Sequence, residues 1–389
     1  MSVRTPQGLA SGPVYLDYNA TTPVDPVVVE AIVPFLAEHF GNPSSNYEFG
    51  RVAKAALDRA RQQVAALIGA GDGQLVFTGS GSEADALAIR GAVLAAGPAE
   101  GRHVITQATE HPAVLAACVD LRDGHGVDVT VLRVDGDGTL DPDAVEAALT
   151  PATALVTVML ANNETGTLQP VAEIARRAHA RGVAVHCDAA QAVGKIDVDV
   201  TELGVDLLTV VGHKMYAPKG ISALWVAPGT PLRPLVGGGG QESGLRAGTE
   251  NVAYAVGLGV AAELAEAALA RGESERLAEL RNRLEDELGQ GLPGRMSVNG
   301  HRDRRLPNTA NLSFAGVRAL DLLAACPGVA ASAGSACHAG LDSPSPVLTA
   351  MGVAGDRAMS AVRLSVGRWT TEAEVDRAAE LILAAARGR

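Results

Sequence analysis

The stretch AEIARRAHARGVAVHCDAAQ, residues 172–191, sets the fold class of this chain. Its first nine residues place apolar side chains at helical spacing, and AVHC (184–187) then gives a short apolar run typical of a buried strand. A second run of this kind, LLTVV (207–211), follows after a short connection. Short apolar strands separated by helices need crossover connections, which produce a parallel sheet covered by helices. The stretch therefore predicts an α/β fold.

The same alternation continues on both sides of this stretch. We expect further strands at the apolar or β-branched runs 75–77, 103–106, 129–134 and 154–160. Apolar residues with helical spacing predict helices at 51–68, 83–94 and 172–180. Near residue 250 the pattern changes to two long helices, followed by strands and helices expected at 309–314, 318–325, 362–366 and 372–387. We therefore predict a large domain and a smaller α+β domain. The large domain, residues 15–255, has a mainly parallel sheet flanked by helices, and the small one comprises residues 256–389 with 1–14.

Composition excludes several classes of protein. The chain has 389 residues with 44 acidic and 32 basic side chains, and it has no basic run, so nucleic acid and anionic membranes are not expected partners. The apolar stretch 252–270 is interrupted by Glu263 and Glu266, and residues 1–14 lack the apolar core of a signal peptide. Four cysteines are too few for a disulfide framework. We expect a cytoplasmic protein.

Lysine is rare, which narrows the search for a reactive amine. The chain has four lysines: Lys54, Lys195, Lys214 and Lys219. Lys214 comes three residues after the predicted strand 207–211, and the neighbouring His213 favours a lowered amine pKa suited to Schiff-base chemistry. The alternative is a surface lysine beside a turn. Lys219, in the sequence P-K-G, is predicted to be an exposed turn residue.

Two further polar groups follow predicted strands. Asp188 comes directly after AVHC, where open α/β sheets place ligand-binding groups; the alternative is an N-cap for a following helix. TGSGSEADALAI (78–89) joins a strand to a helix. There Gly81 permits close backbone approach and Ser82 supplies a hydroxyl, as an anion site requires. The alternative is a serine N-cap with a glutamate partner.

These groups match one cofactor. Pyridoxal phosphate needs a Schiff-base lysine, a carboxylate at its pyridine nitrogen and a phosphate cradle. Lys214, Asp188 and the turn at 78–82 supply one of each. His111, in TEHPAV, is the candidate for the ring that stacks on the pyridine, the alternative being a loop histidine with satisfied hydrogen bonds. The sequence therefore predicts a pyridoxal phosphate site.

Cys337 is a candidate nucleophile. It lies in ASAGSACHAGLDSPSP (331–346), a run of small residues and turn formers that predicts an exposed, mobile loop. The alternative is an incidental loop cysteine. Cys118 and Cys187 have apolar surroundings, and Cys326 lies at a predicted helix end, so all three are expected to be structural.

Ten motifs in order give the chain a resemblance to a known family. They are YLDYNATTP (15–23), GNPSS (41–45), TGSGSE (78–83), EHPAV (110–114), ANNETG (161–166), DAAQAVGK (188–195), GHK (212–214), GGGQESGLRAGTEN (238–251), GSACHAG (334–340) and VRLSVGR (362–368). Over residues 14–385 the chain resembles the cysteine desulfurases and the similar selenocysteine lyases, which are fold-type I pyridoxal phosphate enzymes.

The resemblance implies a role for each matching residue. Lys214 would bind the cofactor covalently, Asp188 would protonate the ring nitrogen, and Gln191 would bond the phenolic oxygen. His111 would stack on the ring and take part in proton transfer. The phosphate would be held by Gly81, Ser82 and His213, with Thr249 reaching in from the neighbouring subunit of a homodimer. The substrate carboxylate would be bound by Asn163 and Arg363, with Asn19 nearby.

The implied reaction converts L-cysteine to L-alanine, leaves a persulfide on Cys337 for a sulfur-acceptor protein, and uses no metal ion. Many cysteine desulfurases have a phosphate-binding serine where this chain has Val211. Val211 and the loop C-H-A-G at 337–340 favour the alternative, a selenocysteine lyase that releases selenide. Two other hypotheses are a plain aminotransferase, for which Cys337 would be dispensable, and a non-catalytic scaffold. The sequence does not identify the sulfur acceptor, because iron–sulfur assembly, tRNA thiolation, DNA sulfur modification and the synthesis of thiolated natural products all use such enzymes.

Overall fold

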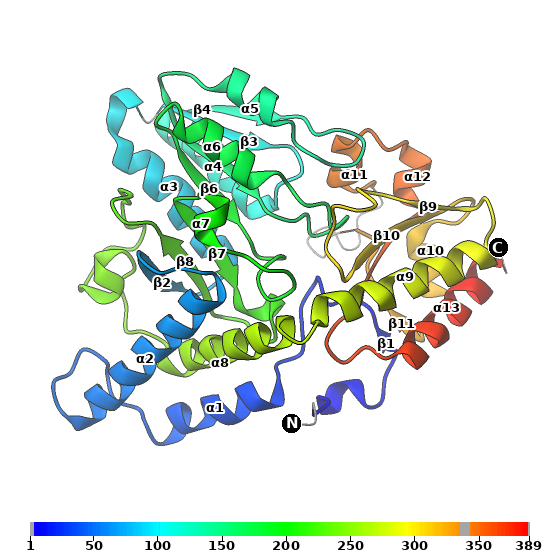
Figure 1. The fold of residues 1–389 in the computed structure, drawn as a ribbon, viewed down its shortest axis with the longest axis horizontal. Helices are drawn as coiled ribbons and strands as arrows, with labels where there is room; N and C mark the ends of the chain where they lie inside the picture. Colours follow the sequence, from blue (N-terminus) through cyan, green and yellow to red (C-terminus); the bar gives the residue numbers. More distant parts are fainter. Residues whose placement is uncertain (1–3, 101, 335–342, 388–389) are drawn as a thin grey trace.

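A seven-stranded sheet forms the centre of the large unit in the computed structural model, which describes residues 4–100, 102–334 and 343–387 (Figure 1). The strands in sheet order are β2 (Gln74–Thr78), β8 (Ser222–Val226), β7 (Leu207–Val211), β6 (Ala184–Asp188), β5 (Thr153–Met159), β3 (His103–Gln107) and β4 (Asp128–Leu132). β8 runs antiparallel to both of its neighbours, and the pairs from β7 to β4 are all parallel. The predicted α/β fold with a mainly parallel sheet is confirmed.

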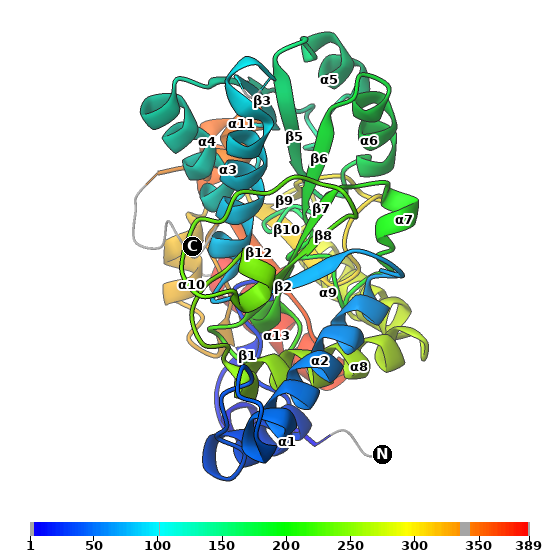
Figure 2. The same cartoon turned by 90° about the vertical axis from the view of Figure 1, so that its left-hand side faces the viewer.

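Helices cover both faces of this sheet (Figure 2). Those of the large unit are α1 (Pro26–Ala37), α2 (Glu48–Leu67), α3 (Gly81–Glu100), α4 (Pro112–His125), α5 (Pro142–Ala148), α6 (Val171–His179), α7 (Val200–Leu203) and α8 (Val252–Leu269). Successive residues of a strand point to opposite faces of the sheet and belong to different cores. Leu155 and Leu207 pack with α3 and α4 on one face. Val156 and Leu208 pack with α2, α6 and α8 on the other. Because both faces are buried, these strands are continuous apolar runs rather than alternating patterns.

A smaller unit lies beside the large one and has its own core (Figure 1). Its antiparallel sheet has the order β12 (Ala361–Ser365), β10 (Thr309–Phe314), β9 (Met296–Val298), and β1 (Val14–Tyr15) pairs with β11 (Val329–Ala330). Its helices are α9 (Glu273–Gly291), α10 (Ala319–Ala324), α11 (Pro346–Ala350), α12 (Gly355–Met359) and α13 (Glu372–Arg387). This core is built largely from α9, α13 and the antiparallel sheet.

Helix α8 connects the two units. It is long and apolar enough to cross a membrane by composition, but ten of its residues are buried, and it packs against α1 and α2 in the core of the large sheet. The core of the small unit includes Leu277 of α9 but no residue of α8. The domain division at residue 255 stays a prediction. Along the chain, the change from the core of the large unit to the core of the small unit falls between α8 and α9.

Candidate active site

A cavity of about 410 Å³ lies at the carboxyl ends of the parallel strands. Chain turns leave β2, β3, β5, β6 and β7 at this edge, so residues far apart in sequence meet there. Ten of the residues predicted for the site line this cavity: Asn19, Gly81, Ser82, His111, Asn163, Asp188, Gln191, His213, Lys214 and Arg363. Thr249 is exposed and does not line it. Cys337 lies outside the described residues, as does the central part, 335–342, of the loop predicted at 331–346.

Lys214 follows β7 in the short 3-10 helix η2 (Gly212–Lys214). Its Nζ donates hydrogen bonds to the carbonyl oxygens of Asn19 at 2.7 Å and Ala20 at 2.8 Å. The amine is therefore held at the cavity wall by the N-terminal segment, and the alternative of a lysine on the outer surface is wrong.

Asp188 ends β6 and is buried. Its Oδ1 accepts a hydrogen bond from Ala190 N–H at 2.9 Å, but the next helix, α7, begins only at Val200, so the alternative of a helix N-cap is wrong. Burial raises the pKa of Asp188, while the nearby His111 and Lys214 oppose this shift. A buried carboxylate of this kind suits a cationic ligand group, since a positive charge beside it would stabilise its ionised form.

His111 is the N-cap of α4, with Pro112 at the first helical position. Its Nδ1 accepts a hydrogen bond from Ala113 N–H at 3.2 Å, which leaves Nε2 to carry the proton of a neutral ring. Burial lowers the pKa of His111, and Lys214 lowers it further although Asp188 opposes this. The imidazole is therefore neutral near pH 7.

The turn at 78–82 both caps a helix and lines the cavity. Ser80 Oγ accepts from Glu83 N–H at 3.1 Å, and Glu83 Oε2 accepts from Gly79 N–H at 2.7 Å, as the capping alternative predicted. Ser80, Gly81 and Ser82 also face the cavity at the N-terminus of α3. The two interpretations hold together, because the same helix start that is capped also presents a positive dipole end to the cavity.

Gly81 and Val211 are matched in volume. A Cβ built on Gly81 would lie 2.6 Å from Val211 Cγ2, well inside van der Waals contact. The valine methyl therefore fills the space that a side chain at position 81 would need. Val211 is buried at the end of β7 and cannot donate a hydrogen bond to a ligand.

We predict that Gly81→Ala weakens cofactor binding about tenfold or more, because overpacking of this kind costs about 1–3 kcal/mol. Equilibrium dialysis of pyridoxal phosphate measures the change. Adding Val211→Ala should restore wild-type affinity by removing the clash, and Val211→Ser should restore it and add a hydroxyl donor. Wild-type affinity of the single Gly81→Ala variant would contradict this account.

The remaining predicted residues gather around an arginine. Arg363, in β12 and 1% exposed, donates from Nη2 to Asp17 Oδ1 at 2.7 Å and from Nη1 to the Asn163 carbonyl at 2.9 Å. Its Nε has no hydrogen-bond partner among the described residues. Asn19 links the two units, since its Nδ2 bonds Thr309 Oγ1 at 2.8 Å. The small unit therefore supplies a fixed cation to the cavity.

His213 lines the cavity from η2. Its Nδ1 lies 3.1 Å from Thr21 Oγ1, and burial together with Lys214 lowers its pKa to about 4. The ring is therefore neutral near pH 7 and can offer an N–H to a phosphate without adding charge.

Outside the predicted turn at 78–82, three charged or polar lining residues were not predicted: Asp85, Lys219 and Ser222. Asp85 is in α3, where helical spacing alone indicates an ordinary buried position, yet burial and the nearby Asp188 raise its pKa well above its usual range. Lys219 is exposed in its turn, as predicted, but its side chain also borders the cavity. Ser222 pairs directly with Val211 across β7 and β8, so only knowledge of the strand pairing could have identified it.

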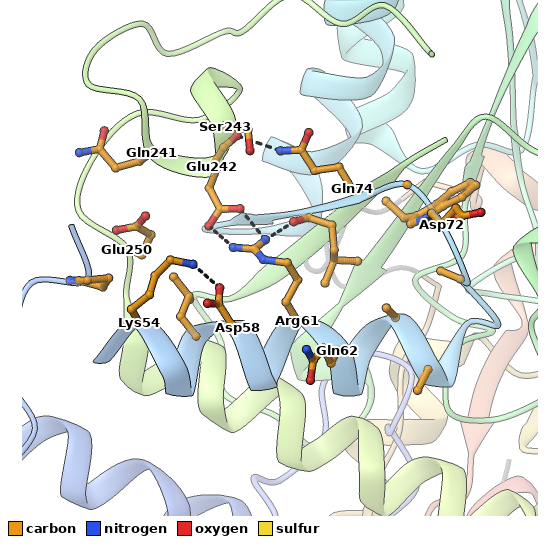
Figure 3. Close-up of a pocket in the computed structure, with 18 of the residues that line it drawn as sticks. Lys54, Asp58, Arg61, Gln62, Asp72, Gln74, Gln241, Glu242, Ser243 and Glu250 are labelled. Carbon is orange, nitrogen blue, oxygen red and sulfur yellow. Dashed lines mark hydrogen bonds and ion pairs between the residues drawn. The ribbon is translucent and has the colours of Figure 1, made fainter. Parts of the chain in front are cut away.

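A segment at 237–250 that carries Thr249 is fixed against α2 by a buried ion pair (Figure 3). Within it, Glu242 belongs to the 3-10 helix η3 (Gln241–Gly244) and accepts hydrogen bonds from the Arg61 guanidinium at 2.8 and 3.1 Å. Its Oε2 also accepts from Phe77 N–H at 3.0 Å. The φ of Glu242 is +47°, a left-handed conformation that non-glycine residues keep only under such constraint. The segment borders a separate cavity of about 690 Å³.

The cavity fits pyridoxal phosphate. It offers an amine at Lys214, a buried carboxylate at Asp188 and a neutral ring at His111. At the helix start, glycine at position 81 leaves the backbone open for close approach. The charge and hydrogen-bonding character of these groups match the aldehyde, ring nitrogen and phosphate of the cofactor.

Comparison with known proteins supports the assignment of pyridoxal phosphate to this cavity. The aminotransferase class-V family matches residues 14–378. The chain is 49% identical to the cysteine desulfurase of Trichormus azollae over 371 residues, which are 95% of this chain and 92% of that protein. A solved NifS-like protein superposes with a TM-score of 0.88 at 34% identity, covering 96% of this chain and 98% of that one. SspA, solved in complex with cysteine, gives 0.79 at 35% identity, with 92% and 99% covered.

This similarity spans both units and every element that lines the cavity. The chain therefore belongs to the aminotransferase class-V family and, within it, to the cysteine desulfurases, which depend on pyridoxal phosphate.

Proposed function

We propose that this enzyme removes sulfur from L-cysteine, forms L-alanine and carries the sulfur as a persulfide on Cys337. The observation that supports this most is the single cavity where Lys214, Asp188 and His111 of the large unit meet Arg363 of the small unit. One side of the cavity can hold the cofactor and the other can hold an amino-acid carboxylate. When bound, pyridoxal phosphate supplies an electron sink that makes the substrate α-proton removable.

Arg363 and Asn163 orient the substrate in this proposal. The guanidinium is held by Asp17 and by the Asn163 carbonyl, which use two of its five N–H groups, so the others can meet a carboxylate without rearrangement. A buried arginine with a fixed partner forms a strong, directional contact with a carboxylate. This contact fixes which bond of the substrate faces Lys214.

Two groups of the chain move protons. Lys214 is the amine that binds the cofactor and, once displaced by the substrate amine, is a base at the cavity wall. His111 is neutral with its proton on Nε2, so it can donate a proton from that atom as charge develops. Gln191 offers its Nε2 as a donor to the phenolic oxygen, and Gly81, Ser82 and His213 surround the phosphate.

Cys337 performs the sulfur transfer. Its thiolate attacks the substrate sulfur, an S–S bond forms, and the substrate C–S bond breaks with its electron pair going to carbon, which is then protonated to give alanine. Described residues on both sides of the segment that contains Cys337 bond to a residue that lines the cavity or to the neighbour of one. Ser332 pairs with Arg363 at 2.7 and 3.3 Å, and Ser345 Oγ donates to Glu164 Oε2 at 2.6 Å, next to Asn163.

Turnover with two amino acids tests this function. Purified enzyme should form alanine from L-cysteine with persulfide on Cys337, and kcat/KM for L-cysteine and L-selenocysteine should be compared directly. The absence of alanine from L-cysteine would refute the proposal. A strong preference for selenocysteine with free selenide would replace it with the lyase activity, for which Val211 is the motivating residue.

We further propose that the enzyme acts as a homodimer and delivers sulfur to an acceptor protein. Apolar side chains are exposed on α1, in the connection after it and at the start of α2: Val29, Val33, Leu36, Phe40, Tyr47 and Phe49. Phe40 is 72% exposed and stacks on Phe49 at 5.3 Å, so a second copy covering this face would bury a large apolar area. Thr249 is exposed and does not line the cavity of its own chain, so in the dimer it could bind the cofactor phosphate of the partner subunit. Light scattering at twice the monomer mass is the expected result, and a monomer would contradict it.

A further inference from the structure

Lys195 is a buried lysine that the proposed reaction leaves without a role. It is 6% exposed in the turn between β6 and α7, and its Nζ donates a hydrogen bond to Gln191 Oε1 at 2.6 Å. Among the described residues no carboxylate forms an ion pair with it. Burial lowers the pKa of Lys195 well below its usual range, and the positive charges of Lys214 and Arg363 lower it further. A lysine in such surroundings is costly and needs an explanation.

The contacts of Gln191 give that explanation. Gln191 lines the cavity and is itself 4% exposed. Its Nε2 donates to the Asn19 carbonyl at 3.0 Å, and the same carbonyl accepts from Lys214 Nζ at 2.7 Å. A carbonyl can only accept, and the Lys195 amine donates to the opposite end of the amide. The two neighbours therefore impose one amide orientation, with Nε2 on the side of Lys214.

We propose that Lys195 is a positioning residue that acts through Gln191, fixing its amide so that Nε2 is presented as a hydrogen-bond donor to the phenolic oxygen of the cofactor. This inference rests on the proposed role of Gln191. Without the lysine, Oε1 would be a buried acceptor lacking its donor, and the amide would turn to find another. An acceptor facing an anionic phenolic oxygen would repel it.

The identity of the side chain supports this role. Only four of the 32 basic residues in the chain are lysines, so arginine is the ordinary basic residue of this protein. Arginine stays charged in any protein environment, whereas a buried amine can lose its charge and still donate an N–H. A position between Lys214 and Arg363 needs a donor that adds little positive charge, and lysine meets that need.

The test uses the cofactor-loaded enzyme with Lys195→Met, since methionine fills the same buried space without a donor. Visible absorption should shift, and the dissociation constant of pyridoxal phosphate should rise about tenfold, the effect of losing one hydrogen bond to a charged group. Lys54→Met is the matched control, because the Lys54 side chain is exposed on α2, and it should leave both values unchanged. Lys195→Leu is a second donor-free variant if methionine is not accommodated.

A double-mutant cycle separates positioning from a merely structural role. In a Gln191→Leu background, Lys195→Met should change neither the absorption nor the dissociation constant any further. A wild-type spectrum and affinity for Lys195→Met, or a full additional effect in the Gln191→Leu background, would overturn the proposal. Neither readout needs a substrate, so failure of this inference is distinguishable from failure of the desulfurase reaction, which alanine formation by the wild type reports.

Discussion

Replacing Lys214 by arginine is expected to abolish alanine formation and to remove the visible absorption of the cofactor-loaded enzyme. The guanidinium keeps the positive charge but stays protonated and lacks a nucleophilic amine, so no covalent bond to the cofactor aldehyde can form. Loss of a group that acts directly on the reacting atoms costs on the order of 10⁴-fold in kcat or more. Alanine assays and absorption spectra on the dialysed protein measure both effects.

The control for this variant is Lys54→Arg, which keeps the ion pair with Asp58 on α2 and should behave like the wild type. Retained alanine formation by Lys214→Arg would contradict every role assigned in the cavity. Loss of activity with unchanged absorption would show that another amine holds the cofactor, and Lys219, which borders the cavity, would be the candidate.

Replacing Cys337 by alanine should separate cofactor chemistry from sulfur transfer. The variant should keep its absorption and its spectral response to L-cysteine, because every described cofactor-binding group remains. Alanine formation from L-cysteine should fall by about 10³-fold or more, since the nucleophile is gone. Mass spectrometry of the protein after incubation with L-cysteine should then find no persulfide.

Cys326→Ala is the matched control, because Cys326 is buried at the end of α10 and burial raises the pKa of its thiol. It should keep full turnover. Undiminished alanine and sulfide release by Cys337→Ala would contradict the assigned nucleophile. Turnover of selenocysteine that survives this substitution would indicate selenide release without a stable persulfide.

The sequence predicted the inner strands of the parallel sheet well because each is a short apolar run buried on both faces, and it predicted the edge strand β4, which is partly exposed, from its β-branched residues. It missed β8, since the P-K-G turn before it indicates a loop and its antiparallel direction depends on pairing with β2 and β7. It also missed α1, whose sequence PVVVEAIVPFLA is rich in β-branched residues and contains Pro34. Asp25 caps this helix by accepting from Val27 N–H, a local signal that could have identified it.

For the site, residues directly after strands were predictable because parallel strands end at one edge. Asp85 and Lys195 were not, because their significance comes from what surrounds them. Asp85 lies in a helix with ordinary spacing, and the Lys195 side chain forms its one described hydrogen bond to Gln191, four residues earlier. Burial and partner identity depend on tertiary packing, which no local pattern encodes. The close contact between Gly81 and Val211 also depends on tertiary packing, so the sequence alone did not predict it.

The scarcity of lysine has a practical consequence for handling this enzyme. Amine-reactive esters would find Lys195 shielded by the protein interior and Lys214 screened whenever the cofactor is attached, which leaves Lys54, Lys219 and the chain's α-amino group. Of the two lysines, only Lys219 borders the cavity around Lys214, whereas Lys54 lies on α2, paired with Asp58, at the separate cavity of Figure 3. Biotin or a fluorophore attached at Lys54 would tether the enzyme to a support through α2, without modifying a residue of the cavity around Lys214.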